Sequence, residues 1–489
     1  MRIPCLSRNT LDEYRFSSSE RSAESTRATR FAQAMKSQDP LLEAWEETLA
    51  RKGDAPAIYA TSGKVIRTFF DVEQHALAVQ AKMPASKPFD VNPIQIGNHS
   101  DWPSLFLACL RTQRVVLPID DSISKHQAEA IFSIAARSGT TDWRGKPPTL
   151  FKLTSGTTAT PRLVRFRSEQ LLADCNQICD TMGIHGADLN FGVIAISHSY
   201  GFSNLLTPLI VRGVPLVISN DRTPRAILDD LARSKATVFP GMPVFYQAFC
   251  EMENTPVPPN LRLCISAGAP LPILVAKKFQ EKFQLPIHSF YGSSECGGIC
   301  YDREATNPSE GSVGEAMKGV SVEMIDPNGS ATQIRVRSAA AGDGYFPEPD
   351  EEKLGNGTFV PDDLLVRHGS GFEIVGRISD VINVAGKKVN PAEVESHLLG
   401  FTGVWQAVVF GRPAGAGALR NEEVSACVVA APGISETDLL QFCRARLSTW
   451  QVPKQIFIVD EIPVNERGKI SRRELSQLLS TRRWRSRLP

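Results

Sequence analysis

Between residues 40 and 300, apolar residues recur at helical spacing in some stretches and form short β-branched runs in others. From Pro40, four large apolar residues fall on one helical face before Gly53 ends the pattern: Leu41, Leu42, Trp45 and Leu49. Thr223 and Pro224 suit the N-cap and the first position of another helix. The pattern therefore predicts helices separated by short strands.

Two of the apolar runs predict buried strands. Residues 236–239 form the first, which Pro240 and Gly241 should stop, and residues 261–265 form the second, which runs into a turn at 266–270. Repeated alternation of strand, turn and helix is typical of α/β layers with a mainly parallel sheet.

After about residue 300, glycine and proline become frequent and short strands dominate, which predicts a small, mostly β subdomain that ends near Val375. The last stretch, of about 110 residues, has the size of a separate domain. Ser435 and Asp438 form a capping box that opens a helix there. Strands are expected at 407–410, 424–430 and 455–459. We therefore expect an α/β fold, with layered α/β sheets and a small β subdomain in a large N-terminal domain, followed by a small α+β C-terminal domain.

Composition excludes several classes of protein. Of the 489 residues, 42% are hydrophobic and 22% are charged, and the net charge of +1 argues against binding of nucleic acid. No apolar run reaches the ~18 residues of a membrane span, and residues 1–36 lack the apolar stretch of a secretory signal. The ten cysteines have no histidines at zinc spacing, so we expect reduced, buried thiols in a cytoplasmic protein.

The N-terminal segment 1–36 is rich in Ser, Arg and Glu and is interpreted as a flexible leader. A transit peptide is the weaker interpretation, because the segment carries acidic residues. Arginines dominate residues 479–489, which we interpret as a solvated basic tail.

The richest motif is the stretch from Leu153 to Arg162, which combines hydroxyls, a glycine and a cation. Small residues let backbone N–H groups turn toward an anion, so such a loop can hold polyphosphate oxygens. It is not a Walker A loop, because no Gly-Lys-Ser/Thr follows at the required spacing.

Four further motifs follow in order: Tyr291-Gly-Ser-Ser-Glu295, Asp363, Gly376-Arg-Ile-Ser-Asp380 and Asn465-Glu-Arg-Gly-Lys469. With the first motif, this ordered set resembles the adenylate-forming (AMP-binding) superfamily, which includes acyl-CoA synthetases, peptide adenylation domains and luciferases. The resemblance runs from about residue 92 to about 476. It implies a mobile C-terminal domain, with a nucleotide-binding domain at 37–376, a hinge at 377–380 and a lid at 381–478.

The resemblance also implies a nucleotide site. The phosphates of ATP would be held by Thr154, Ser155, Gly156, Thr157, Thr158 and Arg162, where Arg162 stands for the family's lysine and Ala159 for a glycine. Tyr291 would stack on adenine, and Ser294 would bond a phosphate oxygen. Glu295 would hold Mg²⁺, a hard cation that prefers carboxylate and phosphate oxygens.

Asp363 and Arg377 would contact the ribose, while Gly268 and Gly292 would leave space along the pocket. Lys469 matches the family's catalytic lysine, although taken alone it is one cation in a basic tail. His198 would stand at the mouth of the carboxylate site. In relatives that activate amino acids, this segment carries an aspartate that binds the α-ammonium group. Residues 197–206 contain no acid, so the resemblance implies a substrate without an α-amine.

The resemblance thus implies ATP-dependent formation of an acyl-adenylate with release of pyrophosphate, then transfer of the acyl group to a thiol, that of CoA. Two other interpretations stay open. A carrier protein shares the pantetheine arm of CoA, and no carrier domain is expected at either end of the chain. A non-catalytic nucleotide-binding relative would account for Ala159, Arg162 and Pro361, but not for Glu295 and Lys469.

Overall fold

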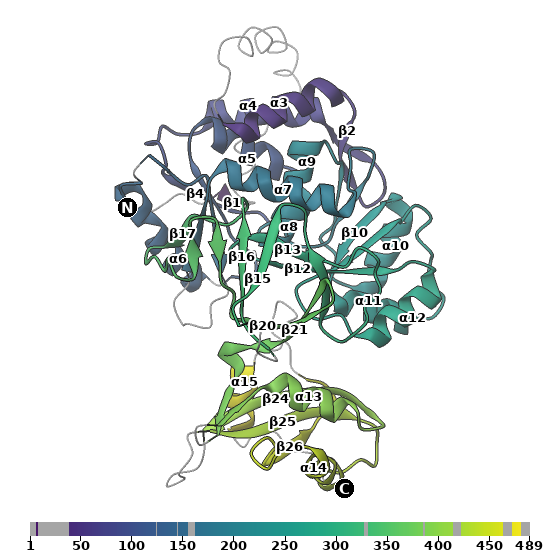
Figure 1. Cartoon of the computed structure of the whole chain (residues 1–489). Coiled ribbons are helices and arrows are strands. Elements are labelled where there is room, and N and C mark those ends of the chain that lie inside the picture. Colours follow the sequence, from purple (N-terminus) through teal and green to yellow (C-terminus); the bar gives the residue numbers. More distant parts are fainter. Residues whose placement is uncertain are drawn as a thin grey trace. The chain divides into compact units, whose positions relative to one another are not determined.

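The computed structural model describes residues 6–7, 39–123, 125–143, 145–154, 162–326, 331–384, 387–413, 422–462 and 472–480. The chain divides into two compact units (Figure 1). The first unit comprises Met1–Glu323, Arg335–Val360 and His368–Phe372. The second comprises Met324–Ile334, Pro361–Arg367 and Glu373–Pro489.

One sheet of the first unit runs in the order β1-β4-β5-β6-β7-β17. Its strands are β1 (Leu6–Ser7), β4 (Val91–Gln95), β5 (Val115–Pro118), β6 (Leu150–Thr154), β7 (Arg162–Phe166) and β17 (Gly344–Phe346). The strands from β1 to β6 are parallel, whereas β7 is antiparallel to both β6 and β17. The last pairing brings Tyr345 beside Val164, far from it in sequence.

A second sheet carries strands in the order β14-β13-β12-β11-β10-β8-β9-β2-β3. They are β2 (Pro56–Ala60), β3 (Val65–Thr68), β8 (Asn190–Gly192), β9 (Leu216–Ile218), β10 (Val238–Gly241), β11 (Leu263–Ser266), β12 (Ile287–Ser293), β13 (Gly297–Tyr301) and β14 (Ser312–Ala316). The strands between β12 and β2 are parallel, and β13 and β3 are antiparallel additions. A smaller sheet has the order β15-β16-β19-β18, with β15 (Val320–Met324), β16 (Ile334–Ser338), β18 (Leu354–Gly355) and β19 (Thr358–Phe359).

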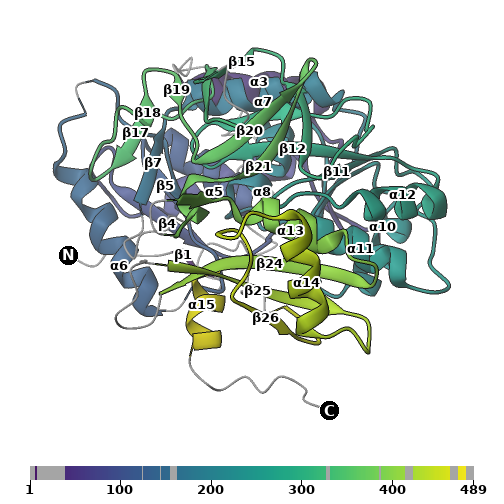
Figure 2. The ribbon, with the colours of Figure 1, turned by 60° about the horizontal axis from the view of Figure 1, so that its bottom comes forward.

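Helices cover both large sheets. They are α3 (Pro40–Lys52), α4 (Phe69–Lys82), α5 (Trp102–Arg111), α6 (Lys125–Ala136), α7 (Ser168–Met182), α8 (Ser199–Gly201), α9 (Thr207–Arg212), α10 (Pro224–Ser234), α11 (Pro243–Glu251) and α12 (Ile273–Phe283), with a short turn η2 (Arg137–Thr140) and a π-helical turn η3 (Phe202–Leu206). Helices α10, α11 and α12 lie together near β11 (Figure 2). Their apolar faces form one core with that sheet, in which Phe239, Tyr246 and Phe249 are fully buried. Burial of each such ring contributes about 1.5–3 kcal/mol.

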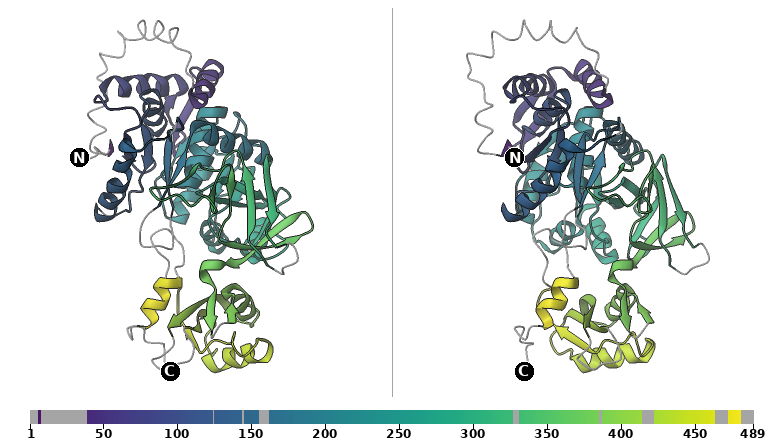
Figure 3. Two further views of the ribbon diagram at one scale, coloured as in Figure 1. Left: turned by 60° about the vertical axis from the view of Figure 1, so that its left-hand side comes forward. Right: turned by 90° about the vertical axis from the view of Figure 1, so that its left-hand side faces the viewer.

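The second unit contains most of β20 (Asp363–His368) and most of β21 (Gly371–Arg377). It also contains η4 (Ile378–Asp380), β22 (Ile382–Val384), β23 (Lys387–Val389), α13 (Pro391–Leu399), β24 (Val404–Pro413), β25 (Glu422–Ala430), α14 (Glu436–Arg446), β26 (Gln455–Ile458) and α15 (Arg472–Ser480). Strands β24 and β25 are antiparallel, and β26 joins β25 in parallel. Helices α13 and α14 pack on the sheet face that carries Val409, while α15 packs on the opposite face with Phe410 (Figure 3).

Several predictions are confirmed. Helix α3 begins after Asp39, whose side chain accepts from the N–H groups of Leu41 and Leu42, and it ends at Gly53. The Ser435–Asp438 capping box is present at the start of α14. The cysteines that the structure describes are free thiols, as expected. Among the described helices, none combines the length and the apolar character needed to cross a bilayer.

One local prediction was wrong. Strand β10 does not stop before Pro240 but runs on to Gly241, and Pro240 pairs with Ile265 of β11. On its other side, β10 pairs with β8 only at Val238, so the N–H that proline lacks has no strand partner there to lose. The prediction for α10 is confirmed, because Thr223 stands at the N-cap and the helix begins at Pro224, although the Thr223 side chain makes no capping hydrogen bond.

Candidate functional site

The predicted site residues of the first unit come from the carboxyl ends of its parallel strands. Thr154 ends β6, His198 follows β8, Gly268 follows β11, and Tyr291 lies near the end of β12. Because parallel strands present their carboxyl ends at one edge of a sheet, β8, β11 and β12 bring the last three segments to a common edge.

The hairpin of β6 and β7 holds the two described ends of the predicted phosphate loop. Thr154 pairs with Arg162 across the hairpin, and the Thr154 hydroxyl donates to the backbone oxygen of Arg162 at 3.3 Å. Four predicted phosphate ligands, Ser155, Gly156, Thr157 and Thr158, lie outside the described residues. The structure therefore places Arg162 at the end of the loop, beside Thr154.

Arg162, Tyr345 and Glu295 form one connected cluster. The Arg162 guanidinium lies 3.7 Å from the centroid of the Tyr345 ring, and its Nη2 atom lies 3.7 Å from Asp350 Oδ2. The Tyr345 hydroxyl donates to Glu295 Oε1 at 3.2 Å. The predicted phosphate-binding cation and the predicted metal-binding carboxylate are thus joined through a residue that the sequence motifs did not single out.

Glu295 can serve as the single protein ligand of a metal ion whose other ligands include the phosphates of a bound nucleotide. Burial of Glu295 raises the pKa of its carboxyl, and the hydrogen bonds that the carboxylate accepts offset this shift only in part. A bound cation would therefore stabilise the ionised form. Within the described residues no group of three or more His, Cys, Asp or Glu side chains could hold a metal. Mg²⁺ typically takes one or two carboxylates plus substrate phosphates, so a single carboxylate fits this ion.

The segment around Glu295 is tightly constrained. A Cβ atom on Gly292 would lie 2.7 Å from the backbone oxygen of Gly297, so the turn accepts only glycine there. Tyr291 is buried, and Ser294 accepts a hydrogen bond from the Ser199 hydroxyl at 2.8 Å. This bond ties the motif to the residue that follows His198.

His198 is exposed, and its Nδ1 atom accepts from the backbone N–H of Tyr200 at 3.2 Å, which makes it the N-cap of α8. Gly268 adopts a φ of +87°, and a Cβ atom there would meet nothing within 4 Å. Its requirement for glycine is therefore conformational rather than steric.

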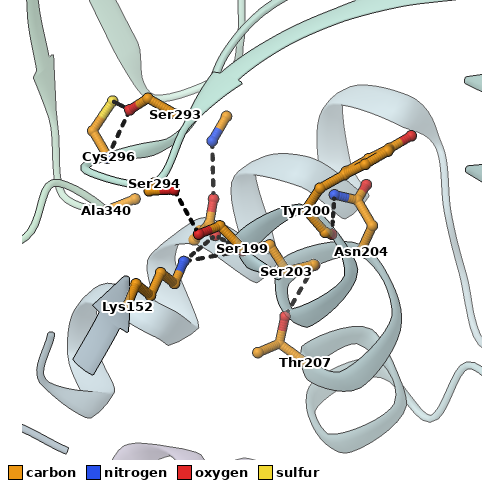
Figure 4. A network of polar contacts seen from close by, with 12 residues as sticks. Lys152, Ser199, Tyr200, Ser203, Asn204, Thr207, Ser293, Ser294, Cys296 and Ala340 are labelled. Carbon is orange, nitrogen blue, oxygen red and sulfur yellow. Dashed lines mark hydrogen bonds and ion pairs between the residues drawn. The ribbon is translucent and has the colours of Figure 1, made fainter. Parts of the chain in front are cut away.

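A buried polar network lies behind these segments (Figure 4). The Lys152 side chain extends from β6 toward Ser203 of η3; its ammonium donates to the Ser203 hydroxyl at 3.3 Å and lies 3.9 Å from Asp174 Oδ2. Ser203 donates in turn to Asp174 at 2.5 Å, and Asp174 accepts from the N–H of Gly298 at 3.1 Å. Burial lowers the pKa of Lys152, whereas Asp174 opposes that shift. The network connects β6, α7, η3 and β13, which flank the predicted nucleotide residues.

In the second unit the structure brings Asp363 and Arg377 together. The Arg377 Nε donates to Asp363 Oδ1 at 2.6 Å; Asp363 is buried, whereas the Arg377 side chain is 59% exposed. The predicted hinge residue Asp380 pairs with Arg472 at 2.5 Å, and Arg472 also bonds both oxygens of Glu395. Lys469 lies outside the described residues, three positions before Arg472.

Sequence reasoning missed Tyr345, Lys152, Asp174 and Arg472. For Lys152 a signal existed, because a lysine interrupts an otherwise apolar strand, and such a charge needs a buried partner. No local pattern marks Tyr345, since its partners lie about 50 and 180 residues away in the chain.

Known proteins resemble this chain in sequence. Residues 144–346 match the family model of AMP-binding enzymes, and residues 393–469 match the model of the AMP-binding enzyme C-terminal domain. A probable CoA ligase of Humulus lupulus is 29% identical over 67% of this chain and 65% of its own length. The benzoate–CoA ligase of Thauera aromatica is 28% identical over 60% of this chain and 59% of its own length, so each match spans less than two thirds of the relative.

Two solved structures share the fold. ATP-bound MatB from Rhodopseudomonas palustris has a TM-score of 0.77 at 22% identity, covering 90% of this chain and 99% of that one. The o-succinylbenzoate CoA synthetase of Bacillus subtilis, in complex with its acyl-adenylate intermediate, has a TM-score of 0.76 at 19% identity, covering 91% and 99%. With its two family models matched in order and its fold shared, the chain belongs to the adenylate-forming, acyl-CoA synthetase-like superfamily.

Proposed function

We propose that this protein is an AMP-forming acid–thiol ligase that activates a carboxylic acid with ATP and passes the acyl group to CoA. The observation that carries this proposal is the cluster of Arg162, Tyr345 and Glu295 beside Thr154. A cation and a carboxylate held together at the end of a Ser/Thr-rich loop provide what a nucleotide and its metal require.

In the first step, a carboxylate oxygen of the acid attacks the α-phosphorus of ATP. A P–O bond forms, the bond to the β-phosphate bridging oxygen breaks, and pyrophosphate leaves. Mg²⁺, held by Glu295 and the phosphates, would offset the negative charge of the triphosphate. Arg162 and the loop after Thr154 orient the phosphates, and Lys469 stabilises the charge that gathers on the α-phosphate.

In the second step, the thiol sulfur of CoA attacks the acyl carbon of the adenylate. A thioester bond forms, AMP leaves with the former carboxylate oxygen, and the thiol proton passes to solvent. In the same proposal, residues 37–376 form the nucleotide-binding domain, 377–380 the hinge and 381–478 the lid, with Asp363 and Arg377 on the ribose and Tyr291 on adenine.

The proposed substrate is an acid without an α-amine, because residues 197–206, which include His198 and η3, offer no carboxylate for an ammonium group. Relatives at 27–28% identity include proteins named as ligases of benzoate, oxalate and ferulate, and these acids also lack an α-amine. A pantetheine-bearing carrier protein is the alternative acceptor, and a cytoplasmic location is part of the same proposal.

The test is exchange of labelled pyrophosphate into ATP across a panel of acids, followed by thioester formation with CoA. Exchange with amino acids alone would contradict the substrate proposal, and absence of exchange with every acid would favour the non-catalytic alternative. Glu295→Gln keeps the size of the side chain but removes its charge, so we expect a clear rise in the Mg²⁺ concentration needed for exchange. An unchanged Mg²⁺ titration would remove Glu295 from the metal site.

A further inference from the structure

Tyr345 occupies the position between two side chains of the proposed nucleotide site. It lies in β17, which is antiparallel to β7, and it pairs with Val164, two residues beyond Arg162. The residue is 3% exposed, so the surrounding chain fixes its ring. Strand pairing therefore delivers an aromatic ring to the end of the phosphate loop from a segment about 180 residues later.

The ring supports Arg162. The guanidinium carbon lies 3.7 Å from the ring centroid, within the range of a cation–π contact. A planar guanidinium stacks well on an aromatic face, whereas a compact ammonium does not, which gives a physical reason for arginine at this position. Asp350, 3.7 Å from Nη2, restricts the same guanidinium by an ion pair.

The hydroxyl of Tyr345 orients Glu295. It donates to Oε1 at 3.2 Å, leaving Oε2 without a hydrogen bond to this tyrosine. The same short segment also holds the backbone of Glu295, because the N–H of Gly342 donates to the Glu295 oxygen at 2.9 Å. The segment thus anchors both the main chain and the side chain of the proposed metal ligand.

We propose that Tyr345 is a positioning residue of the nucleotide site, which holds Arg162 and Glu295 as one unit by its ring and its hydroxyl. This inference rests on the proposed function for the identity of the ligand, MgATP. Tyr345 itself does not contact the substrate; it acts through Arg162 and Glu295.

Two variants separate the two contacts. Tyr345→Phe removes only the hydroxyl and keeps the ring under Arg162. Tyr345→Leu removes the ring as well. Tyr246→Phe is the matched control, since it removes a buried hydroxyl that donates to the backbone oxygens of Phe239 and Ile265, away from this cluster.

The measurement is equilibrium binding of ATP by calorimetry over a range of Mg²⁺ concentrations, together with kcat and the apparent KM for ATP in pyrophosphate exchange. Tyr345→Phe should raise the Mg²⁺ concentration at half-saturation by about 2- to 10-fold, the effect of one lost hydrogen bond, and leave Mg²⁺-free ATP affinity unchanged. Tyr345→Leu should also lower Mg²⁺-free ATP affinity, by about 2- to 30-fold.

A double-mutant cycle tests the coupling directly. In an Arg162→Leu background, Tyr345→Leu should cause no further loss of Mg²⁺-free ATP affinity, because the ring then has no guanidinium to support. Additive losses would overturn the proposed contact. Tyr345 would have only a structural role if Tyr345→Phe gave a wild-type Mg²⁺ titration. The same would follow if the Tyr345 variants lowered only the melting temperature, the result expected of the control Tyr246→Phe.

The outcomes distinguish this inference from the proposed function. If the wild-type protein binds MgATP but exchanges no pyrophosphate with any acid, the proposed activity fails while the binding titrations still test Tyr345. If exchange proceeds and Tyr345→Phe behaves as wild type in both titrations, the activity stands and the inference fails. A wild-type protein that binds no MgATP would overturn both.

Discussion

Replacing Lys152 by methionine removes one charge of a buried ion pair and should destabilise the first unit strongly. The side chains of Lys152 and Asp174 are each 4% exposed, and their charged atoms lie 3.9 Å apart. Methionine fills a similar volume and suits the neighbouring rings, because the ammonium lies 4.6 Å from the Phe166 ring centroid. The variant therefore leaves Asp174 as a buried carboxylate without its cation.

Removal of one partner from a buried pair typically costs about 3–5 kcal/mol of the free energy of unfolding. We expect a value near the lower end, about 3 kcal/mol, because Asp174 keeps the hydrogen bonds from Ser203 and from the N–H of Gly298. For a large unit each kcal/mol lowers the melting temperature by about 2–4 °C, so we expect a fall of about 6–12 °C.

The assay is thermal and denaturant unfolding of Lys152→Met, Asp174→Asn and the double variant. The double variant removes both charges, so it should recover at least half of the stability that Lys152→Met loses. Arg111→Met is the control. It breaks the ion pair between Arg111 of α5 and Glu73 of α4, whose side chains are more exposed than those of Lys152 and Asp174. Wild-type stability of Lys152→Met, or a double variant less stable than either single one, would refute the reasoning.

Three further outcomes can be checked. Burial lowers the pKa of His75 from 6.5 to about 4, so between these pH values the unfolded chain binds a proton that the folded chain does not. The free energy of unfolding should therefore fall by up to about 3 kcal/mol as pH drops from 6.5 to 4. In denaturant titrations, His75→Gln should weaken this pH dependence. Gly297→Ala would place a Cβ atom 2.0 Å from Asp174 at a φ of +70° and should unfold far more readily than Gly183→Ala, whose Cβ meets nothing within 4 Å; equal melting temperatures would contradict this. Lys469→Ala should lose on the order of 10²–10³ in the rate of adenylate formation yet still convert supplied acyl-adenylate to thioester, and a parallel loss in both half-reactions would assign the lysine a general structural role.

The sequence alone determined the α/β class and the elements with strong local signals. The helix that begins at Pro40 could be recognised from the helical spacing of its apolar residues, and the Ser435 capping box because its hydrogen bonds join residues three apart. The ordered motifs identified the superfamily for a related reason: each is a short contiguous segment whose residue types satisfy one local chemical demand.

The tertiary structure alone decided which distant residues complete the site. Tyr345 reaches Glu295 and Arg162 because β17 pairs with β7, and Lys152 meets Asp174 because β6 and α7 pack around η3. The strand through Pro240 depended in the same way on where its neighbour β8 ends. A linear pattern records what each residue prefers locally, whereas these contacts depend on strand order and register, which long-range packing fixes.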